Sequence, residues 1–252
     1  MKPSTPLQTC RIALLGAEST GKTALAQGIQ AHFQAQGIST ALVPEYLRTW
    51  CDAAGRTPRP EEQLGIAQEH ARQALGACAA EGVDSEKGPQ RGQFLPDSPR
   101  RLLAPTEARL LVADTTPLMV AVYSDFIFGD RSLYPFALEH QRSYDLTLLT
   151  GLDLPWVADG LQRDGAHVRE PVDALVRAAL DGAGIGYRII YGSGSARLDN
   201  ALFAINSAAS CGGILGTKAS FRSENVTSRP WACEKCSDPD CEHRLFSGLL
   251  RT

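Results

Sequence analysis

The segment GAESTGKT, residues 16–23, limits what this chain can fold into more than any other part of the sequence. It follows CRIALL, a short apolar run that predicts a buried parallel strand. After it, Leu25, Ile29 and Phe33 recur at helical spacing, which predicts an amphipathic helix that ends near Gly37. The pattern G-x-x-x-x-G-K-T between a strand and a helix is typical of a P-loop, which binds the phosphates of a nucleotide.

Each residue type in this segment suits phosphate binding. Gly16 and Gly21 allow backbone angles that direct successive N–H groups toward phosphate oxygens, and the helix N-terminus adds its dipole. Lys22 is placed to reach the terminal phosphates, and the Thr23 hydroxyl is placed to bind Mg²⁺. We therefore expect the whole segment to bind ATP, through Gly16, Ala17, Glu18, Ser19, Thr20, Gly21, Lys22 and Thr23.

Strand-like and helix-like stretches alternate along the rest of the chain. Further strands are predicted at residues 41–43 and in RLLVADTT, YDLTLLTG and YRIIYGSG. Helices are predicted at residues 60–82 and in PLMVAVYSDFIFG, VDALVRAALDGAG and ARLDNALFAINSA. This alternation predicts an α/β fold of the P-loop NTPase type, with a mostly parallel five-stranded sheet flanked by helices. The proline-rich residues 86–105 are predicted to form a flexible insertion.

Two acidic residues fall at predicted strand ends, where ligands bind in parallel sheets. Asp114 ends a strongly apolar strand, so we expect it to hold Mg²⁺ together with Thr23; the alternative is that it caps the next helix. Glu45 lies beside Tyr46 and Arg48. It is placed either to orient or deprotonate a substrate hydroxyl, or only to form a surface ion pair with Arg48.

The charged stretch 153–170 lies between a predicted strand and a predicted helix. Arg163 and Arg169 in this stretch could close over a phosphoryl group during transfer and stabilise its charge. An ordinary exposed loop would carry the same arginines, so both interpretations remain open.

The sequence shows no secretion signal and no apolar run of membrane-spanning length. We therefore expect a cytoplasmic protein with reduced thiols. Cys10, Cys51, Cys78 and Cys211 are scattered, and we expect them to be small buried side chains and not disulfide partners.

The last 26 residues, 227–252, contain a Cys- and His-rich tail with the spacing C-x₂-C-x₄-C-x-H. Three thiolates and one imidazole suit Zn²⁺, so Cys233, Cys236, Cys241 and His243 predict a zinc knuckle. The alternative is a disordered tail in which these thiols have no shared ligand.

Four stretches together resemble one family. GAESTGKT, VPEYLR, VADTTPLMVAVYSDFIFG and YDLTLLTGLDLPWVADGLQRD are similar to the nicotinamide riboside kinase domain of the bacterial bifunctional regulator of NAD biosynthesis, and to its stand-alone AAA-type relatives. The resemblance covers about residues 11–206 and makes residues 1–226 the kinase domain. It implies a nucleoside-kinase-like sheet, and transfer of phosphate from ATP, with Mg²⁺, to the 5′-hydroxyl of nicotinamide riboside. This reaction gives the mononucleotide for NAD salvage.

The resemblance also implies roles for individual residues. It implies that Trp156 stacks on the pyridine ring of the substrate, where a cation–π attraction would stabilise a cationic ring. It places Asp159 and Arg163 in a lid, and Tyr46 among the substrate-binding residues. The implied catalytic residues are Lys22, Glu45, Asp114 and Arg163, and the implied substrate-binding residues are Glu45, Tyr46, Arg48, Trp156 and Asp159.

The chain departs from this family in the sequence TTPLM after Asp114, where the closest members carry a further aspartate, and in the insertion at residues 86–105. A second function therefore stays open, that of an ATP-binding regulatory protein whose zinc tail contacts nucleic acid or protein. The formal net charge of −3 gives no general attraction to nucleic acid or to anionic membranes. A small nucleoside is accordingly the preferred partner.

Overall fold

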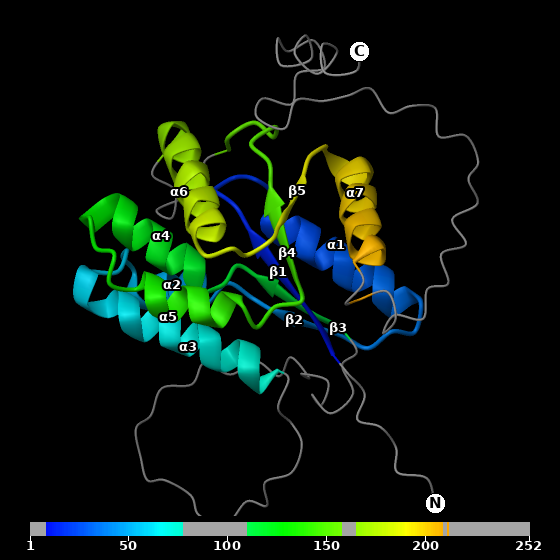
Figure 1. Ribbon diagram of the computed structural model, residues 1–252, viewed down its shortest axis with the longest axis horizontal. Coiled ribbons are helices and arrows are strands. Elements are labelled where there is room, and N and C mark those ends of the chain that lie inside the picture. Colours follow the sequence, from blue (N-terminus) through cyan, green and yellow to red (C-terminus); the bar gives the residue numbers. More distant parts are fainter. Residues whose placement is uncertain (1–8, 78–109, 158–164, 209–210, 212–252) are drawn as a thin grey trace, which may run out of the picture.

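The computed structural model describes residues 9–77, 110–157, 165–208 and 211 of the 252-residue chain. Five strands form one parallel sheet in the order β2-β3-β1-β4-β5 (Figure 1). They are β1 (Cys10–Leu15), β2 (Thr40–Val43), β3 (Leu110–Asp114), β4 (Leu146–Thr150) and β5 (Arg188–Ile190). This arrangement confirms the predicted P-loop NTPase fold class.

Helices cover both faces of the sheet (Figure 1). Helices α1 and α7 pack on one face, and α3, α4, α5 and α6 lie on the other. The α-helices are α1 (Lys22–Ala35), α2 (Tyr46–Ala54), α3 (Gln63–Gly76), α4 (Pro117–Phe128), α5 (Tyr134–Gln141), α6 (Arg169–Gly182) and α7 (Gly194–Ser207), with short 3₁₀ turns at Pro60–Glu62 and Ala166–Val168. No helix among the described residues is both long enough and apolar enough to cross a membrane.

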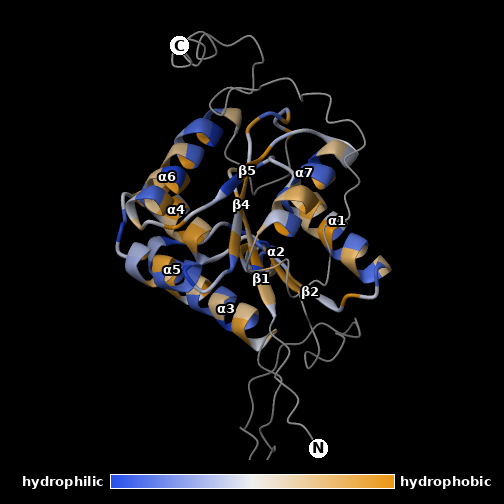
Figure 2. Cartoon of the chain, turned by 45° about the vertical axis from the view of Figure 1, so that its right-hand side comes forward, coloured by the Kyte–Doolittle hydropathy of each residue, from blue (hydrophilic) through white to orange (hydrophobic). Residues whose placement is uncertain are grey.

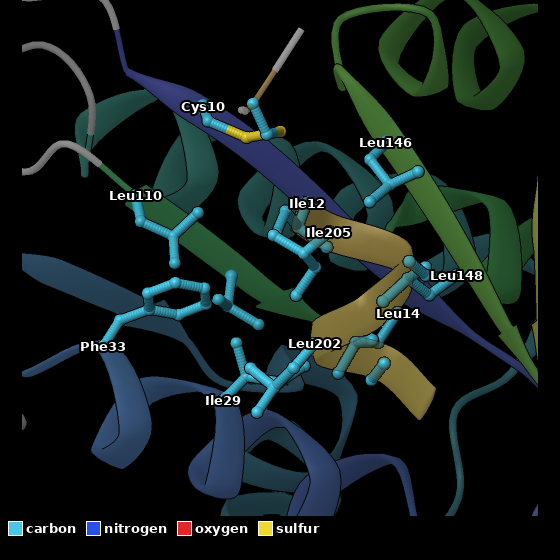
Figure 3. Close-up of a cluster of buried hydrophobic side chains, with 14 of the residues drawn as sticks. Cys10, Ile12, Leu14, Ile29, Phe33, Leu110, Leu146, Leu148, Leu202 and Ile205 are labelled. Atoms are coloured by element: carbon cyan, nitrogen blue, oxygen red, sulfur yellow. A yellow bond between two sulfur atoms is a disulfide. The ribbon is translucent and has the colours of Figure 1, made fainter. Parts of the chain in front are cut away.

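Alternate residues of the central strand face opposite sides, as the pleat of a strand requires. Ile12 and Leu14 belong to the apolar cluster under α1 and α7, whereas Leu15 belongs to the cluster under α4 and α6. Phe33 and Ile29 of α1 are fully buried against the first cluster (Figure 3). Each such side chain contributes about 1.5–3 kcal/mol of burial free energy. The hydropathy colouring shows the same apolar helix faces turned toward the sheet (Figure 2).

The strand order places a crevice at the carboxyl end of β1. The neighbouring strands β1 and β3 are followed by α1 and α4, which cover opposite faces of the sheet, and ligands bind at such a point in folds of this type. The register pairs Leu14 of β1 with Asp114 of β3. Asp114 is therefore held beside the segment that follows β1.

The sequence predicted all five strands and five of the seven α-helices, but not α2 or α5. The helix predicted at residues 60–82 is described as far as Ala77, with its α-helical part ending at Gly76. The predicted insertion at 86–105 and the predicted tail domain at 227–252 lie outside the described residues.

The expectation that the scattered cysteines are unpaired is wrong for two of them. Cys10 and Cys211 form a disulfide between the first residue of β1 and the region after α7 (Figure 3). Both side chains are fully buried, so the predicted burial is correct, and folding brings their Cα atoms to 5.4 Å. A separation of 201 residues carries no sequence signal of such a pair. Cys51 is a buried free thiol, as expected, and Cys78 lies outside the described residues.

Candidate functional site: a P-loop beside an acidic strand end

The segment 16–23 forms a compact turn between β1 and α1. Gly16, Ser19 and Gly21 have φ angles of 147°, 56° and 76°. The left-handed region is unfavourable for Ser19, since it carries a Cβ, so its surroundings must hold it there. Gly16 cannot be replaced without rearrangement, because an added Cβ would lie 2.1 Å from the Thr150 Oγ1.

Contacts from the end of β4 hold this turn. The Thr20 side chain is fully buried, and its Oγ1 donates to the Ala17 carbonyl at 2.8 Å. The hydroxyls of Thr20 and Thr150 lie 2.7 Å apart, and Thr150 Oγ1 donates to the Leu15 carbonyl at 3.1 Å. The two threonines therefore link the turn to the ends of β1 and β4.

The side chain of Lys22 folds back over the turn. Its Nζ donates to the Ala17 carbonyl at 2.7 Å. A bound phosphate would offer the ammonium a charged acceptor in place of this carbonyl, and a charge-assisted hydrogen bond is the stronger of the two. Lys22 is thus held inside the loop at the place expected for a phosphate-binding lysine.

Asp114 is buried at the end of β3, with 3% of its surface exposed. Burial raises the pKa of its carboxyl above the usual range, against the opposing effect of a hydrogen bond with Thr23. Among the described residues, its Oδ1 has no hydrogen-bond partner. The alternative of a helix cap is excluded, because Thr116 caps α4 by accepting from the Leu118 N–H at 3.2 Å.

The donor set of Thr23 and Asp114 fits Mg²⁺. A hydroxyl and a carboxylate are oxygen ligands of the kind that this ion prefers. The Asp114 Oδ1 is a buried acceptor without a partner in the described chain, so a cation or its bound water would satisfy it. Magnesium would supply neutralisation of phosphate charge at this point.

Glu45 and Arg48 form the ion pair that was one of the two interpretations of Glu45. Arg48 Nε donates to Glu45 Oε2 at 2.8 Å, and the side chains are 39% and 18% exposed, respectively. Both residues also border a cavity, so the ion pair and a role toward substrate are compatible. Glu45 is the residue just before α2, and Arg48 lies in the first turn of that helix.

The P-loop, Asp114 and the Glu45–Arg48 pair line a common cavity of about 520 Å³. This volume falls in the range of small-ligand sites. Residues 19–24 form one wall, and the other is formed by Pro44, Glu45, Arg48, Thr49, Asp52 and Asp114. The cavity thus brings together residues 19–23 of the predicted phosphate-binding segment, Asp114, and the predicted substrate residues Glu45 and Arg48.

Two predicted substrate residues do not line this cavity. Trp156 donates from Nε1 to Glu18 Oε2 at 3.2 Å, so it lies against the P-loop. Tyr46 packs against the apolar cluster of α4 and α6. The described geometry therefore gives Trp156 and Tyr46 contacts with the protein at positions where sequence reasoning expected contacts with substrate.

Arg169 is a structural residue in the described part of the chain. It is 8% exposed, and its Nη2 donates to the Leu152 carbonyl at 3.1 Å. This hydrogen bond stabilises the segment after β4. Arg169 is not among the residues that line the cavity.

The remaining predicted site residues lie outside the described residues. These are Asp159 and Arg163 of the predicted lid, and Cys233, Cys236, Cys241 and His243 of the predicted zinc knuckle. Within the described ranges, no group of three or more His, Cys, Asp or Glu side chains is placed to hold a metal ion.

Sequence reasoning missed four residues that line the cavity, Ala24, Pro44, Thr49 and Asp52, and it missed Arg197 behind the P-loop. Thr49 and Asp52 border the cavity because α2, which was not predicted, brings them one and two turns along from Glu45. Arg197 of α7 contacts the P-loop from behind, and donates to the Thr20 carbonyl at 2.9 Å. A helical reading of YLRTWCDAA would have found Thr49 and Asp52, since both recur with Glu45 at helical spacing.

The fold and this site define a P-loop domain of the NTPase type. Residues 11–197 match the family model described as AAA domain, so the chain belongs to that family. No curated protein matches the chain in sequence.

The fold is similar to a crystal structure of the NadR protein in complex with NR. The TM-score is 0.57 at 15% sequence identity, over 79% of this chain and 50% of that chain. The present chain therefore spans about half the length of that protein, and the likeness is one of fold.

Proposed function

We propose that this protein is an ATP-dependent kinase that phosphorylates the 5′-hydroxyl of a nucleoside, with nicotinamide riboside as the preferred substrate. The observation that carries the proposal is the cavity in which the P-loop, Asp114 and the Glu45–Arg48 pair face one another. A nucleotide switch needs only the first of these walls. A kinase also needs a place for an acceptor beside the terminal phosphate, and the presence of the α2 wall in the same cavity supports this role.

The P-loop residues would bind and orient the triphosphate. Backbone N–H groups of residues 19–23 and the ammonium of Lys22 would surround the phosphate oxygens, and Thr23 and Asp114 would hold Mg²⁺. Such an arrangement accelerates transfer mainly by positioning the reactants and by stabilising charge.

The α2 wall would bind the acceptor. Glu45 is placed to accept a proton or a hydrogen bond from the acceptor hydroxyl, and Arg48 keeps that carboxylate oriented. Thr49 and Asp52 lie further along the same wall and offer an alcohol and a carboxylate, the groups that commonly bind sugar hydroxyls. Arg48 balances the charge of Glu45 on this wall, and Asp52 adds one further negative charge, which favours a substrate with a cationic ring.

Two further observations support nicotinamide riboside. The motifs quoted above resemble those of the nicotinamide riboside kinase domain, and the similar NadR fold was solved with NR bound. The alternative function, a regulatory protein with a zinc tail, depends on residues outside the described ranges, and no described contact favours it.

The test is direct. Purified protein, ATP and Mg²⁺ are incubated with nicotinamide riboside, uridine, cytidine or adenosine, and nucleotide formation is followed by chromatography. We expect formation of the mononucleotide from nicotinamide riboside, and none with the Lys22→Ala variant. Nucleotide formation only from another nucleoside would correct the substrate, and ATP binding without phosphorylation of any nucleoside would refute the kinase.

A further inference from the structure

Arg197 lies behind the P-loop and uses both Nη atoms in hydrogen bonds. It is 4% exposed, and it donates four hydrogen bonds. Nη2 donates to the carbonyls of Thr20 at 2.9 Å and Gly151 at 3.3 Å. Nη1 donates to the Gly192 carbonyl at 2.6 Å and to Asp153 Oδ1 at 3.1 Å. A guanidinium suits this place, because its planar donors can reach several acceptors at once.

These acceptors belong to three different loops at the carboxyl end of the sheet. Thr20 is in the P-loop, Gly151 and Asp153 follow β4, and Gly192 follows β5. Asp153 adds a second link, because its Oδ2 accepts from the Gly192 N–H at 2.5 Å. The ion pair between buried Arg197 and the partly exposed side chain of Asp153 thereby links the P-loop to the segments that follow β4 and β5.

The bond to the Thr20 carbonyl bears on phosphate binding. In a trans peptide unit, the C=O of Thr20 and the N–H of Gly21 point in opposite directions. When the carbonyl points at Arg197, the Gly21 N–H points away from Arg197. That is the direction in which a phosphate must lie for this amide to bind it, and Gly21 borders the cavity.

The backbone conformation around Thr20 needs stabilising contacts from neighbouring groups. Ser19 and Gly21, on either side of it, both have positive φ angles. The peptide units on either side of Thr20 can turn over unless neighbouring groups hold them. The Thr20 side chain is held by Ala17 and Thr150, and its carbonyl is held by Arg197.

We propose that Arg197 is a positioning residue for nucleotide binding: from the far side of the P-loop, it fixes the Thr20–Gly21 peptide so that the Gly21 N–H faces the phosphates. Arg197 does not touch the nucleotide itself, since it does not border the cavity. This inference rests on the ATP binding of the proposed function, but it does not depend on the identity of the acceptor.

The test compares Arg197→Lys with Arg177→Lys. The lysine at 197 keeps the charge but cannot reach Thr20, Gly151 and Gly192 together. The control changes an Arg–Asp pair at 2.6 Å within α6, away from the P-loop. Binding of Mg²⁺·ATP is measured by titration calorimetry, which reports the dissociation constant separately from the fraction of binding-competent protein.

We expect Arg197→Lys to raise the dissociation constant for Mg²⁺·ATP about 10- to 100-fold, the effect of losing a charge-assisted hydrogen bond, with stoichiometry near that of the wild type. The affinity for the nucleoside alone and the binding by Arg177→Lys should change less than about twofold. A lower stoichiometry at an unchanged dissociation constant would mean that Arg197 only stabilises the fold, and would overturn the inference.

A second variant keeps the test informative if Arg197→Lys does not fold. Asp153→Asn keeps an oxygen for Nη1 but removes the charge that holds the guanidinium. We expect a weakening of Mg²⁺·ATP binding of about 3- to 10-fold. Unchanged ATP affinity in folded Asp153→Asn would count against the inference. Failure of nucleoside phosphorylation with intact ATP binding would refute the proposed function alone.

Discussion

The two ends of the β-sheet both hold polar groups in a buried setting, but they treat charge differently. At the carboxyl end, Lys22, Glu45 and Asp114 border a cavity, and Asp114 retains an oxygen without a partner in the described chain. At the amino end, basic and aromatic side chains pack against one another. The carboxyl end therefore keeps charged side chains accessible to a ligand. At the amino end, packing disfavours the charged form of the titratable side chains.

The amino-end group, called here the basal cluster, consists of Arg11, His70, His140 and Tyr144. The Arg11 guanidinium lies over the Tyr144 ring at 5.0 Å, and the rings of His140 and Tyr144 are 5.5 Å apart. Burial, and then the neighbouring His140, lower the pKa of His70 to about 4. Burial, and then the Arg11 charge, lower the pKa of His140 to about 4. Both imidazoles are therefore neutral at pH 7.

The comparison predicts its largest effect at Lys22. Lys22→Ala removes the charge that we propose binds the phosphates, together with the hydrogen bond to the Ala17 carbonyl. We expect phosphoryl transfer to fall about 10²- to 10³-fold, with a melting temperature close to that of the wild type. Single-turnover kinetics and calorimetry measure the two quantities. A large loss of stability with little loss of activity would place Lys22 among the structural residues.

Asp114→Asn should separate activity from stability. We expect Mg²⁺ affinity in the presence of ATP to fall about 10- to 100-fold. At neutral pH, we expect the free energy of unfolding to rise by roughly 1 kcal/mol, because a buried carboxylate loses its charge. Mg²⁺ titrations of activity and urea denaturation without ligands test both parts. A variant that is less stable than the wild type would show that the carboxylate contributes to the fold.

At the basal cluster, the expected effect is on stability and depends on pH. Because the pKa of His70 is lowered in the folded protein, the unfolded chain binds more protons between pH 6.5 and about 4. Stability is therefore fully present above pH 6.5 and decreases as pH falls toward 4, by roughly 3 kcal/mol at most for this histidine.

His70→Gln should make this pH dependence shallower and leave nucleotide binding at pH 7.5 unchanged. Urea denaturation at a series of pH values measures the slope, and the exposed His167→Gln serves as the control. An unchanged slope in His70→Gln would contradict the assignment.

The smallest effect is expected at the Glu45–Arg48 pair. Arg48 is 39% exposed at its side chain, so Arg48→Ala should cost less than about 1 kcal/mol of stability. If Arg48 orients Glu45 toward an acceptor, the acceptor KM should rise several-fold while the ATP KM stays the same. Steady-state kinetics with each substrate varied in turn measure this difference, and equal changes in both KM values would argue against it.

Local patterns were sufficient for most of the fold and for part of the site. The P-loop, the strand that ends at Asp114 and the amphipathic face of α1 each depend on neighbours in sequence, and all three were predicted. Helix α2 was missed although Tyr46, Leu47 and Trp50 lie at helical spacing and pack against the apolar cluster of α4 and α6, because its nine residues are fewer than the stretch over which such periodicity is usually recognised.

The rest depends on contacts between distant parts of the chain. Thr20 and Arg197 are 177 residues apart, and no motif joins them. The same holds for Thr20 and Thr150, which are 130 residues apart. Trp156 and Glu18, which are joined by a hydrogen bond, are 138 residues apart. A linear pattern cannot decide between such partners, because only the folded chain brings them together.

The disulfide between Cys10 and Cys211 closes the chain between them into a covalent ring. This ring contains every described helix and strand, and only Thr9 of the described residues lies outside it. A protease that cuts once between these cysteines would yield two peptides that remain a single species until a reductant is added. Gel electrophoresis with and without dithiothreitol would therefore reveal in one lane pair whether this ring is closed in a given preparation.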